Sequence, residues 1–501
     1  MRGKKVTVVG LARSGAGAAR LLKYLGADVT VTDKKSEAEL EDTVRELGHT
    51  VKFALGGHPD EAFNSADLIV ISPGISLEVG PVASARARGI PVIGELELAY
   101  KALMSEEFCV KNKPSEQGSS LIAHHSSTFL AVTGSNGKST TTTLLDLMIR
   151  KAGFETLLGG NLGNALSEEI YKIATGNEQR VTAEDNNSSC ATHHLLPDFV
   201  VAEVSSFQLE AIESFRPGIA SILNITPDHM DRYHSISDYR DAKANIYLNQ
   251  RGKDFLVLNA DDPGTMELYN LHFRSGDPAR PKVFFFSRRE RVEGLYFSDG
   301  KIYCNIPGIA CGPHLITAEE IKIRGVHNIE NAMAAGAMAL LAGCPPEAVA
   351  KAMKEFAGLE HRLEFVREFE GVKYVNDSKG TNVGAVVKSL ESFQEPLILI
   401  AGGRDKAGDF SILREPVSRN VKAVVLIGEA SGKIRKAVGD LTKTVIAEDM
   451  AEAVKLSGEM ADTGEVVLLS PACASFDMFR DFEDRGRQFK KLVMDMKSRN
   501  A

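Results

Sequence analysis

The chain repeats one pattern three times: short runs of β-branched and aliphatic residues alternate with stretches of helical periodicity. The first block occupies the first hundred residues, the second begins at residue 129 and the third begins near residue 374. Strands that alternate with helices are typical of α/β units with a parallel sheet. A length of 501 residues also leaves room for about three domains. We therefore predict three α/β domains in series rather than a single small fold.

The domain boundaries follow these three blocks. We place the domains at residues 1–100, 101–358 and 359–501. The central domain contains two polar stretches with little hydrophobic periodicity, near residues 105–127 and 175–197. Both are long for connections in α/β domains, so we predict flexible surface insertions. Each contains two adjacent histidines, which we interpret as solvated loop residues.

The composition narrows the class of protein. Hydrophobic residues make up 43% of the chain, and 59 basic against 67 acidic residues give a net charge of -8. These values argue against disorder and against general nucleic-acid binding. No apolar run approaches the roughly 20 residues of a membrane-spanning helix, the N-terminus does not resemble a signal peptide, and the six cysteines form no CxxC pair. We expect a cytoplasmic protein without a zinc framework or a dense disulfide scaffold.

The strongest local motif is GSNGKST at residues 134–140, which follows an apolar run and precedes a helical pattern. The backbone amides of such a loop can cradle a polyphosphate, Lys138 can add positive charge, and the Ser139 hydroxyl can ligate magnesium. The match to GxxxxGK[ST] is incomplete because Val132 occupies the first glycine position. The motif predicts use of ATP or GTP and leaves the reaction open between kinase, motor, transporter subunit and ligase.

A glycine-containing turn follows the first strand of the N-terminal block. The turn spans residues 9–17, and Asp33 ends the second strand. The glycine spacing does not fit the GxGxxG pattern of NAD-binding domains. We therefore expect a nucleotide or a nucleotide sugar at this strand end, with a turn that binds no ligand as the alternative. Ser72 follows a further strand at the same predicted edge.

Polar groups also follow strands in the other two blocks. Glu203 and His229 come after neighbouring apolar runs, and a carboxylate with an imidazole suits magnesium, although each alone is more often structural. Lys243 lies in a helical pattern, and by itself it is typical of a solvated surface lysine. In the third block, polar loops follow three strands. They suit anion binding, and ordinary polar loops are the alternative.

Several motifs in this order resemble those of the Mur ligases. They are TGSNGKST at 133–140, EVSSFQLE at 203–210, DHMDRY at 228–233, HNIEN at 327–331, HR at 361–362, NDSK at 376–379 and SPACASFD at 470–477. The resemblance covers nearly the whole chain, and within the family it is greatest to the members that add D-glutamate. The two polar insertions depart from the family pattern.

The resemblance implies a fold and an activity. The fold is an N-terminal Rossmann-like domain that binds UDP, a central P-loop ATPase-like domain that binds ATP and a C-terminal Rossmann-like domain that binds the amino acid. The activity is an ATP-dependent amide ligase that adds D-glutamate to UDP-N-acetylmuramoyl-L-alanine through an acyl phosphate, in cytoplasmic peptidoglycan precursor synthesis. The resemblance also implies a monomer that acts on small molecules.

The resemblance further assigns residues to each ligand. For the UDP substrate these are Arg13, Ser14, Asp33, Ser72 and Asn161. For ATP they are Gly134, Asn136, Gly137, Lys138, Ser139, Thr140, Asn328, Asn331, Arg362 and Asp377. For D-glutamate they are Thr381, Lys406, Ser475 and Phe482. Two magnesium ions are shared among Ser139, Glu203, His229 and Lys243, the last as a carbamate formed with carbon dioxide. The catalytic residues are Lys138, His229, Lys243 and Lys379.

Three alternatives compete with this assignment. The first is another amino-acid-adding Mur ligase or a folylpolyglutamate synthase; the chain lacks the Asp-Asn-Pro-Arg motif of diaminopimelate-adding enzymes, and SPACASFD favours D-glutamate. The second is a catalytically silent regulator that binds a nucleotide sugar, against which the complete predicted metal set argues. The third is a P-loop transporter or motor subunit, which nothing beyond the loop supports. Lys406 and a helix start near Ser475 suit the two carboxylates of an acidic amino acid.

Overall fold

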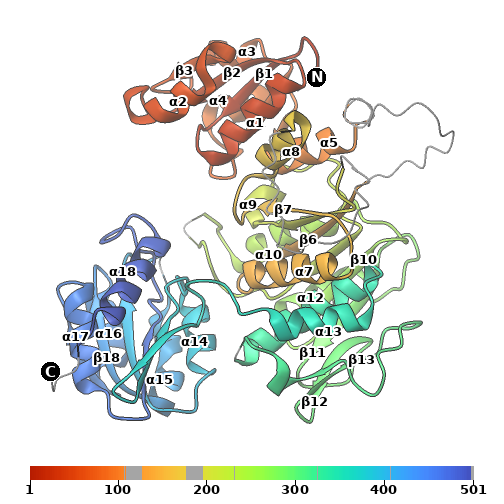
Figure 1. The fold of residues 1–501 in the computed structure, drawn as a ribbon. Coiled ribbons are helices and arrows are strands. Elements are labelled where there is room, and N and C mark those ends of the chain that lie inside the picture. The colour runs from red at the N-terminus through yellow and green to blue at the C-terminus, as the bar shows by residue number, and fades with distance from the viewer. Residues whose placement is uncertain are drawn as a thin grey trace.

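The computed structural model describes residues 1–105, 108, 127–176, 196–230, 232–323, 325–406 and 408–497. Within them the chain forms three sheets, each in its own lobe, in the order of the sequence (Figure 1). This architecture confirms the predicted series of three α/β domains. Most of the two predicted insertions, including their histidine pairs, lies outside the described residues.

The N-terminal lobe is a parallel sheet with the order β3-β2-β1-β4-β5. Its strands are β1 (Lys5–Val9), β2 (Asp28–Asp33), β3 (Lys52–Leu55), β4 (Leu68–Ile71) and β5 (Val92–Gly94), and its helices are α1 (Arg13–Tyr24), α2 (Glu41–Leu47), α3 (Asp60–Asn64) and α4 (Gly80–Ala87). The strand order reverses between β1 and β4. Open α/β sheets bind ligands at the carboxyl ends of strands beside such a reversal.

The central lobe is a nine-stranded sheet with the order β14-β13-β12-β11-β10-β9-β6-β8-β7. Its strands are β6 (Thr128–Thr133), β7 (Thr156–Gly160), β8 (Phe199–Glu203), β9 (Ile219–Ile222), β10 (Phe255–Asn259), β11 (Lys282–Ser287), β12 (Gly294–Ser298), β13 (Lys301–Cys304) and β14 (Ile316–Thr317). The strands from β7 to β12 run parallel, and β13 and β14 add an antiparallel edge that the sequence pattern did not predict.

Helices cover both faces of the central sheet (Figure 1). They are α5 (Glu95–Leu103), α7 (Lys138–Lys151), α8 (Leu166–Thr175), α9 (Ser206–Leu209), α10 (Ile236–Ala244), α11 (Pro263–His272), α12 (Val326–Leu341) and α13 (Pro346–Glu355). Successive residues of β6 face opposite sides of the sheet. Phe129 packs in the core that includes α5 and α8, and Leu130 packs in the core that includes α7, α12 and α13.

The C-terminal lobe is a six-stranded sheet with the order β15-β16-β20-β17-β18-β19, in which only β15 is antiparallel to its neighbour. Its strands are β15 (Glu364–Phe369), β16 (Val372–Asn376), β17 (Leu397–Gly402), β18 (Val421–Ile427), β19 (Lys443–Ile446) and β20 (Val466–Leu469). Its helices are α14 (Val383–Leu390), α15 (Arg414–Asn420), α16 (Ser431–Val438), α17 (Met450–Met460) and α18 (Phe482–Met494). None of the described helices combines the length and the apolar character needed to cross a bilayer.

A buried carboxylate fixes the connection between the first two lobes. Helix α5 continues across residue 100, where we placed the first domain boundary. Glu97 of this helix is 0% exposed, and its carboxylate accepts hydrogen bonds from the backbone N–H groups of Glu213 (3.0 Å), Ser214 (2.8 Å) and Phe215 (2.8 Å). Because a buried charge is tolerated only when it is hydrogen-bonded, these bonds hold α5 against the segment that leads into β9.

Candidate active site

The loop between β6 and α7 depends on two glycines with positive φ. Gly134 has a φ of 151° and Gly137 a φ of 84°, a region that other residues rarely adopt. A Cβ atom on Gly137 would lie 2.2 Å from Oδ1 of Asn331, so α12 packs directly against the loop. Helix α7 begins at Lys138, and the unpaired amides of its first turn face the loop. This conformation suits the binding of an anion.

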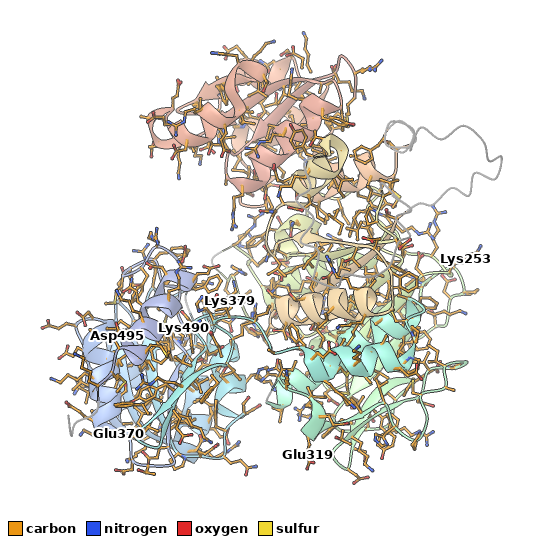
Figure 2. All side chains as sticks on the ribbon, in the orientation of Figure 1. Lys253, Glu319, Glu370, Lys379, Lys490 and Asp495 are labelled. Atoms are coloured by element: carbon orange, nitrogen blue, oxygen red, sulfur yellow. The ribbon has the colours of Figure 1, made fainter. Side chains whose placement is uncertain are left out.

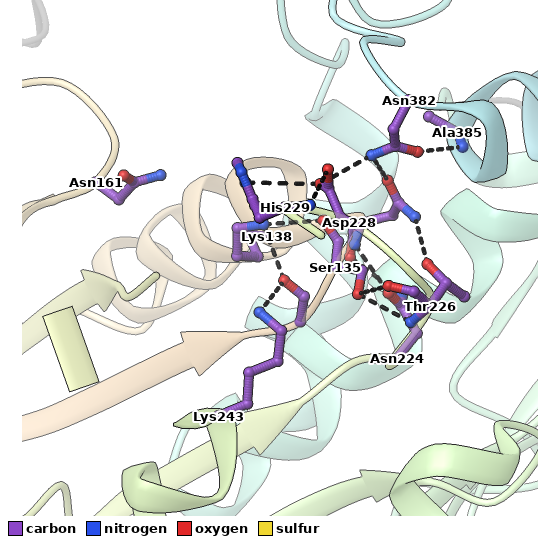
Figure 3. A network of polar contacts seen from close by, with 12 residues as sticks. Ser135, Lys138, Asn161, Asn224, Thr226, Asp228, His229, Lys243, Asn382 and Ala385 are labelled. Carbon is purple, nitrogen blue, oxygen red and sulfur yellow. Dashed lines mark hydrogen bonds and ion pairs between the residues drawn. The ribbon is translucent and has the colours of Figure 1, made fainter. Parts of the chain in front are cut away.

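Lys138 lies folded over this loop. Its ammonium donates hydrogen bonds to the backbone oxygens of Gly134 and Ser135, at 2.9 Å each (Figure 3). Burial lowers the pKa of Lys138, and the carboxylate of Glu203 opposes that shift. Thr140, like its neighbour Ser139, is buried at the start of α7. The predicted ATP residues of the loop therefore form one compact group around a half-buried cation.

A polar network extends the loop toward the segment after β9 (Figure 3). The Ser135 hydroxyl donates to the oxygen of Thr226 (2.8 Å), and the Asn136 backbone N–H donates to Oδ1 of Asn224 (2.8 Å). Sequence reasoning missed Asn224 and Thr226. The signal that could have identified them is their place at the end of β9, which is the neighbour of β6 in the sheet.

The predicted metal ligands Glu203 and Lys243 are both buried near the loop. Asn161 donates to Oε1 of Glu203 (2.6 Å), while Oε2 is buried without a hydrogen-bond partner. Nζ of Lys243 donates to the oxygen of Gly134 (2.9 Å) and lies 4.4 Å from the centre of the Tyr239 ring. An unpartnered carboxylate oxygen in a buried polar cluster fits a cation ligand, so the residues present are compatible with magnesium.

Lys243 differs from the surface lysine that its helical pattern alone suggested. Only 1% of the residue is exposed. Burial lowers its pKa well below the ordinary value, and the nearby ammonium of Lys138 lowers it further. A buried lysine beside a second cation favours the neutral amine. The sequence pattern could not show that Lys243 is buried, because the burial results from the packing of α10 against the phosphate-binding loop.

His229 lies at the mouth of the same cluster. It has a φ of 57°, and its Nε2 lies 3.7 Å from Oδ2 of Asp228. Its ring packs edge-on against Phe207, with ring centres 4.9 Å apart. Figure 3 shows His229 on the same side of the loop as Lys138. A positive φ is uncommon outside glycine, and residues in such conformations cluster at functional sites.

Two residues of the C-terminal lobe, Arg362 and Asn382, contact the phosphate-binding region of the central lobe. Nη2 of Arg362 donates to the Ser139 hydroxyl (2.8 Å). The side-chain amide of Asn382 donates to Oδ1 of Asn136 (3.3 Å) and to Oδ2 of Asp228 (3.2 Å). Sequence reasoning included Arg362 and missed Asn382 as a contact, because its partners lie in a different domain.

Asp377 and Lys379 follow β16. Figure 2 shows Lys379 on the side of the C-terminal lobe that faces the central lobe. The ammonium of Lys379 lies 3.6 Å from the centre of the Phe482 ring, and burial lowers the pKa of Lys379 to about 8. Asp377 accepts hydrogen bonds from the hydroxyls of Ser389 and Ser470, both at 2.7 Å, yet burial raises its pKa to about 6. These groups place both a cation and a carboxyl group beside the loop.

A cavity lies between the phosphate-binding loop and the C-terminal lobe. Predicted ATP residues that line it are Asn136, Gly137, Thr140, Asn328, Asn331, Arg362 and Asp377. The side-chain amide of Asn331 donates to Asn328 (3.0 Å). Arg288 and Glu330 also line the cavity and form an ion pair of 2.6 Å. Sequence reasoning did not identify this pair: Glu330 lies in the HNIEN motif, but Arg288 belongs to none of the motifs and is far from Glu330 in the chain.

Four of the five predicted UDP residues lie around one turn of the N-terminal lobe. Asp33 accepts a hydrogen bond from the backbone N–H of Leu11 (2.6 Å), and the Ser72 hydroxyl donates to the oxygen of Gly10 (2.9 Å). A Cβ atom on Gly15 would lie 1.8 Å from that same oxygen, so the turn requires glycine there. Helix α1 begins with Arg13 and Ser14. Asn161, the remaining predicted UDP residue, lies in the central lobe after β7.

The predicted D-glutamate residues come from three loops of the C-terminal sheet. Thr381 follows Lys379, Lys406 follows β17 and Ser475 follows β20, while Phe482 begins α18. Arg404 and Ala474 exchange backbone hydrogen bonds of 2.9 and 3.0 Å, which hold the second loop against the third. The structure therefore brings these residues to one edge of the sheet.

Comparison with family profiles assigns each lobe to the same family. The profile for the Mur ligase MurD-like N-terminal domain matches residues 4–94. The profile for the Mur ligase middle domain matches residues 132–339, and that for the Mur ligase glutamate ligase domain matches residues 361–473.

Curated relatives match over nearly the full chain. The UDP-N-acetylmuramoylalanine–D-glutamate ligase of Geotalea daltonii is 43% identical, and the match covers 98% of both chains. The enzyme of the same name from Pelotomaculum thermopropionicum is 40% identical over 99% of this chain and 98% of its own.

Solved structures share the fold at lower identity. The UDP-N-acetylmuramate–alanine ligase MurC of Thermotoga maritima has a TM-score of 0.55 at 20% identity, over 99% of this chain and 100% of that one. The MurF ligase of Thermotoga maritima in complex with ADP has a TM-score of 0.56 at 15% identity, over 93% of this chain and 95% of that one. These matches confirm the three-domain architecture.

Proposed function

Because the chain belongs to the Mur ligase family, we propose that it is an ATP-dependent amide ligase that joins D-glutamate to UDP-N-acetylmuramoyl-L-alanine. The observation that carries this proposal is the 43% identity, over 98% of both chains, to a relative named for that reaction. The contact of Arg362 and Ser139 supports it, because it joins the amino-acid lobe to the phosphate-binding loop. The reaction belongs to the synthesis of peptidoglycan precursors.

The N-terminal lobe holds the UDP group in this proposal. Ser72 and Asp33 fix the turn that ends β1, and Arg13 and Ser14 present a cation and a hydroxyl at the start of α1. A helix start with an adjacent guanidinium suits a diphosphate. Asn161 lies beyond this lobe, next to Glu203, where it reaches the muramoyl part of the substrate.

The central lobe binds ATP in the cavity beside the loop. Gly134, Gly137 and the first amides of α7 surround the phosphates, and Lys138 offsets their charge. Asn328, Asn331 and Asp377 line the part of the cavity that takes the nucleoside. Arg362 reaches the same phosphates from the side of the C-terminal lobe.

Ser139, Glu203, His229 and Lys243 would hold two magnesium ions, with Lys243 as a carbamate. Magnesium supplies charge neutralisation and orientation of the phosphates when bound. The unpartnered Oε2 of Glu203 is the observation that fits this role. A neutral lysine amine adds carbon dioxide and releases one proton, which gives an anionic carbamate whose oxygens can bind a cation. The lowered pKa of Lys243 supplies that neutral amine.

The first chemical step transfers the γ-phosphoryl group. The alanyl carboxylate of the UDP substrate attacks the γ-phosphorus in line, the bond to ADP breaks, and an acyl phosphate forms. Lys138 and Lys379 approach this position from different lobes and stabilise the negative charge of the transferring group. Each lysine is held by contacts within its own lobe, while Arg362 and Asn382 join the two lobes, so closure of the third domain over the second completes the site.

The second step forms the amide. The neutral amine of D-glutamate attacks the acyl carbon, a tetrahedral intermediate forms, and phosphate leaves with the former carboxylate oxygen. His229 orients the intermediate or accepts the amine proton, since its imidazole lies at the mouth of the cluster beside Asp228. Lys406, Ser475, Thr381 and Phe482 hold the amino acid. Lys406 and the Ser475 loop suit its two carboxylates.

The remaining parts of the proposal concern partners. We place the enzyme in the cytoplasm as a monomer that acts on small molecules. The net charge of -8 supports the absence of nucleic-acid binding.

The test is phosphate release from ATP and magnesium with UDP-N-acetylmuramoyl-L-alanine, and with D-glutamate, L-glutamate, meso-diaminopimelate or L-lysine in separate reactions. We expect release that depends on D-glutamate alone. Release with another amino acid would favour a different amino-acid-adding ligase. No release with any amino acid would favour a catalytically silent regulator and would contradict the proposal.

A further inference from the structure

Arg485 is the largest fully buried side chain among the described residues, and it lies in the first turn of α18. It is 0% exposed, and within the described part of the chain it forms no ion pair with a carboxylate. Burial lowers the pKa of this guanidinium to about 10. A buried charge without an ionic partner is costly, so its hydrogen bonds must offset the lost hydration.

Those hydrogen bonds all go to two loops of the candidate active site. Nε donates to the Ser378 hydroxyl (2.9 Å), and Nη2 donates to the Ser378 backbone oxygen (2.8 Å). Nη1 and Nη2 both donate to the backbone oxygen of Cys473, at 3.3 Å. The guanidinium therefore connects the loop after β16 to the loop after β20.

Ser378 transmits this contact to Lys379. The Ser378 hydroxyl also donates to the backbone oxygen of Phe482 (2.8 Å), so the start of α18 holds Ser378 from two sides. Lys379 is the next residue, and its ammonium lies over the ring of Phe482. Arg485, Ser378 and Phe482 together fix both the backbone that carries this lysine and the ring beneath its charge.

A third loop passes close to the guanidinium. A Cβ atom on Gly403 would lie 2.2 Å from the oxygen of Ala474 and 3.3 Å from Nη1 of Arg485. Gly403 has a φ of 130°, which favours glycine. The loop that carries Lys406 thus contacts the Ser475 loop at a point close to the Arg485 guanidinium.

We propose that Arg485 is a positioning residue for the ligase reaction: its guanidinium joins the loop after β16 to the loop after β20, beside the loop that carries Lys406, and so sets the places of Lys379 and of the amino-acid pocket. This role rests on the proposed function. The planar fork of arginine donates several hydrogen bonds in fixed directions, which a lysine ammonium cannot reproduce. Arg485 acts through Ser378 and the Cys473 carbonyl and does not contact substrate.

The test compares steady-state phosphate release of the wild type with Arg485→Lys, Ser378→Ala and the double variant. Misplacement of a reacting group by about 1 Å costs up to about 100-fold in rate. We expect Arg485→Lys to lower kcat and raise KM for D-glutamate, each about tenfold, while KM for the UDP substrate stays within about twofold. Ser378→Ala removes one partner of the same contact, so the double variant should resemble the more impaired single variant.

Arg216→Lys is the matched control. Arg216 pairs with Asp254 (2.8 and 3.1 Å) just before β9, at the end of the central sheet opposite the phosphate-binding loop. This variant should lower thermal stability without raising KM for D-glutamate. Wild-type values in Arg485→Lys, or additive losses in the double variant, would overturn the positioning role. A wild type that releases no phosphate with D-glutamate would instead overturn the proposed function.

Discussion

The guanidinium of Arg362 donates a hydrogen bond of 2.8 Å to the hydroxyl of Ser139, across the boundary between two lobes. Ser139 lies in the first turn of α7, directly after the phosphate-binding loop, and Arg362 lies just before β15, the first strand of the C-terminal lobe. Burial lowers the pKa of Arg362, and the carboxylates of Glu203 and Asp377 oppose that shift. One contact therefore couples the position of the amino-acid lobe to the site of phosphoryl transfer.

Arg362→Lys should lower kcat/KM for ATP by about 100-fold, because lysine cannot reproduce the directed donors of the guanidinium at the transferring phosphate. Initial rates at varied ATP measure this effect. Arg414→Lys is the control, since Arg414 pairs with Asp440 on the exposed surface of the same lobe. Equal kcat/KM values for Arg362→Lys and the control would contradict the role of Arg362.

Lys243→Ala should lose most of the activity and regain part of it in acetate or formate, because a short carboxylate can replace the missing oxygen ligand. The measurement is phosphate release with and without these anions. Lys253→Ala, at an exposed lysine of the central lobe, is the control and should retain wild-type activity (Figure 2). An active Lys243→Ala enzyme would rule out the carbamate role.

The pH dependence of kcat/KM for ATP should reflect the protonation of Lys379. Burial lowers its pKa to about 8, and only the protonated ammonium can stabilise the transferring phosphate. A lysine is protonated below its pKa, so kcat/KM for ATP should fall as the pH rises through about 8. In Lys379→Arg this alkaline decrease should disappear, since arginine stays charged. An unchanged alkaline limb in that variant would assign the titration to another group.

Gly15→Ala should impair binding of the UDP substrate. The added Cβ would lie 1.8 Å from the oxygen of Gly10, and the turn after β1 would have to move. We expect KM for the UDP substrate to rise about tenfold while KM for ATP changes little. Gly432→Ala is the control, because nothing lies within 4 Å of the added atom there. Equal KM values in both variants would contradict the assignment of this turn.

Glu97→Ala should destabilise the protein without a direct effect on chemistry. It removes the acceptor of three backbone N–H groups, of which that of Phe215 is buried and the other two are partly buried, and this loss costs about 2 to 4 kcal/mol. The apparent Tm should fall by several degrees. Glu213→Ala changes a residue whose side chain is 65% exposed, and it should leave the Tm nearly unchanged. A similar Tm for both variants would show that the Glu97 contacts contribute little.

The elements that could be predicted are those whose residue pattern lies within one short stretch of the chain. The strand, glycine loop and helix around Lys138 are contiguous in sequence, so the phosphate-binding loop was predictable to within a residue. Asp33 was correctly placed at the end of its strand for the same reason. The contacts of Asn224 and Asn382 with Asn136 join segments that are far apart in the chain, and no periodicity or motif encodes them.

Burial was the property least visible in the sequence. The sequence pattern around Lys243 is typical of an exposed helix, yet packing against the phosphate-binding loop buries the lysine. Arg485 is likewise an arginine in a polar segment, and only the fold places its guanidinium between three loops. The resemblance to a family pointed to Lys243, whereas nothing in the sequence singled out Arg485.

The central claim is that the substrate carboxylate is activated as an acyl phosphate before D-glutamate attacks. The most direct measurement uses a UDP substrate whose alanyl carboxylate carries oxygen-18 at both oxygen atoms, followed by mass analysis of the released phosphate. Our account predicts that each phosphate released in the presence of D-glutamate contains one oxygen-18 atom, because the bond from carbon to that oxygen breaks when the amide forms. Phosphate without the label would contradict the account, since the γ-phosphoryl group would then never have been bonded to the carboxylate.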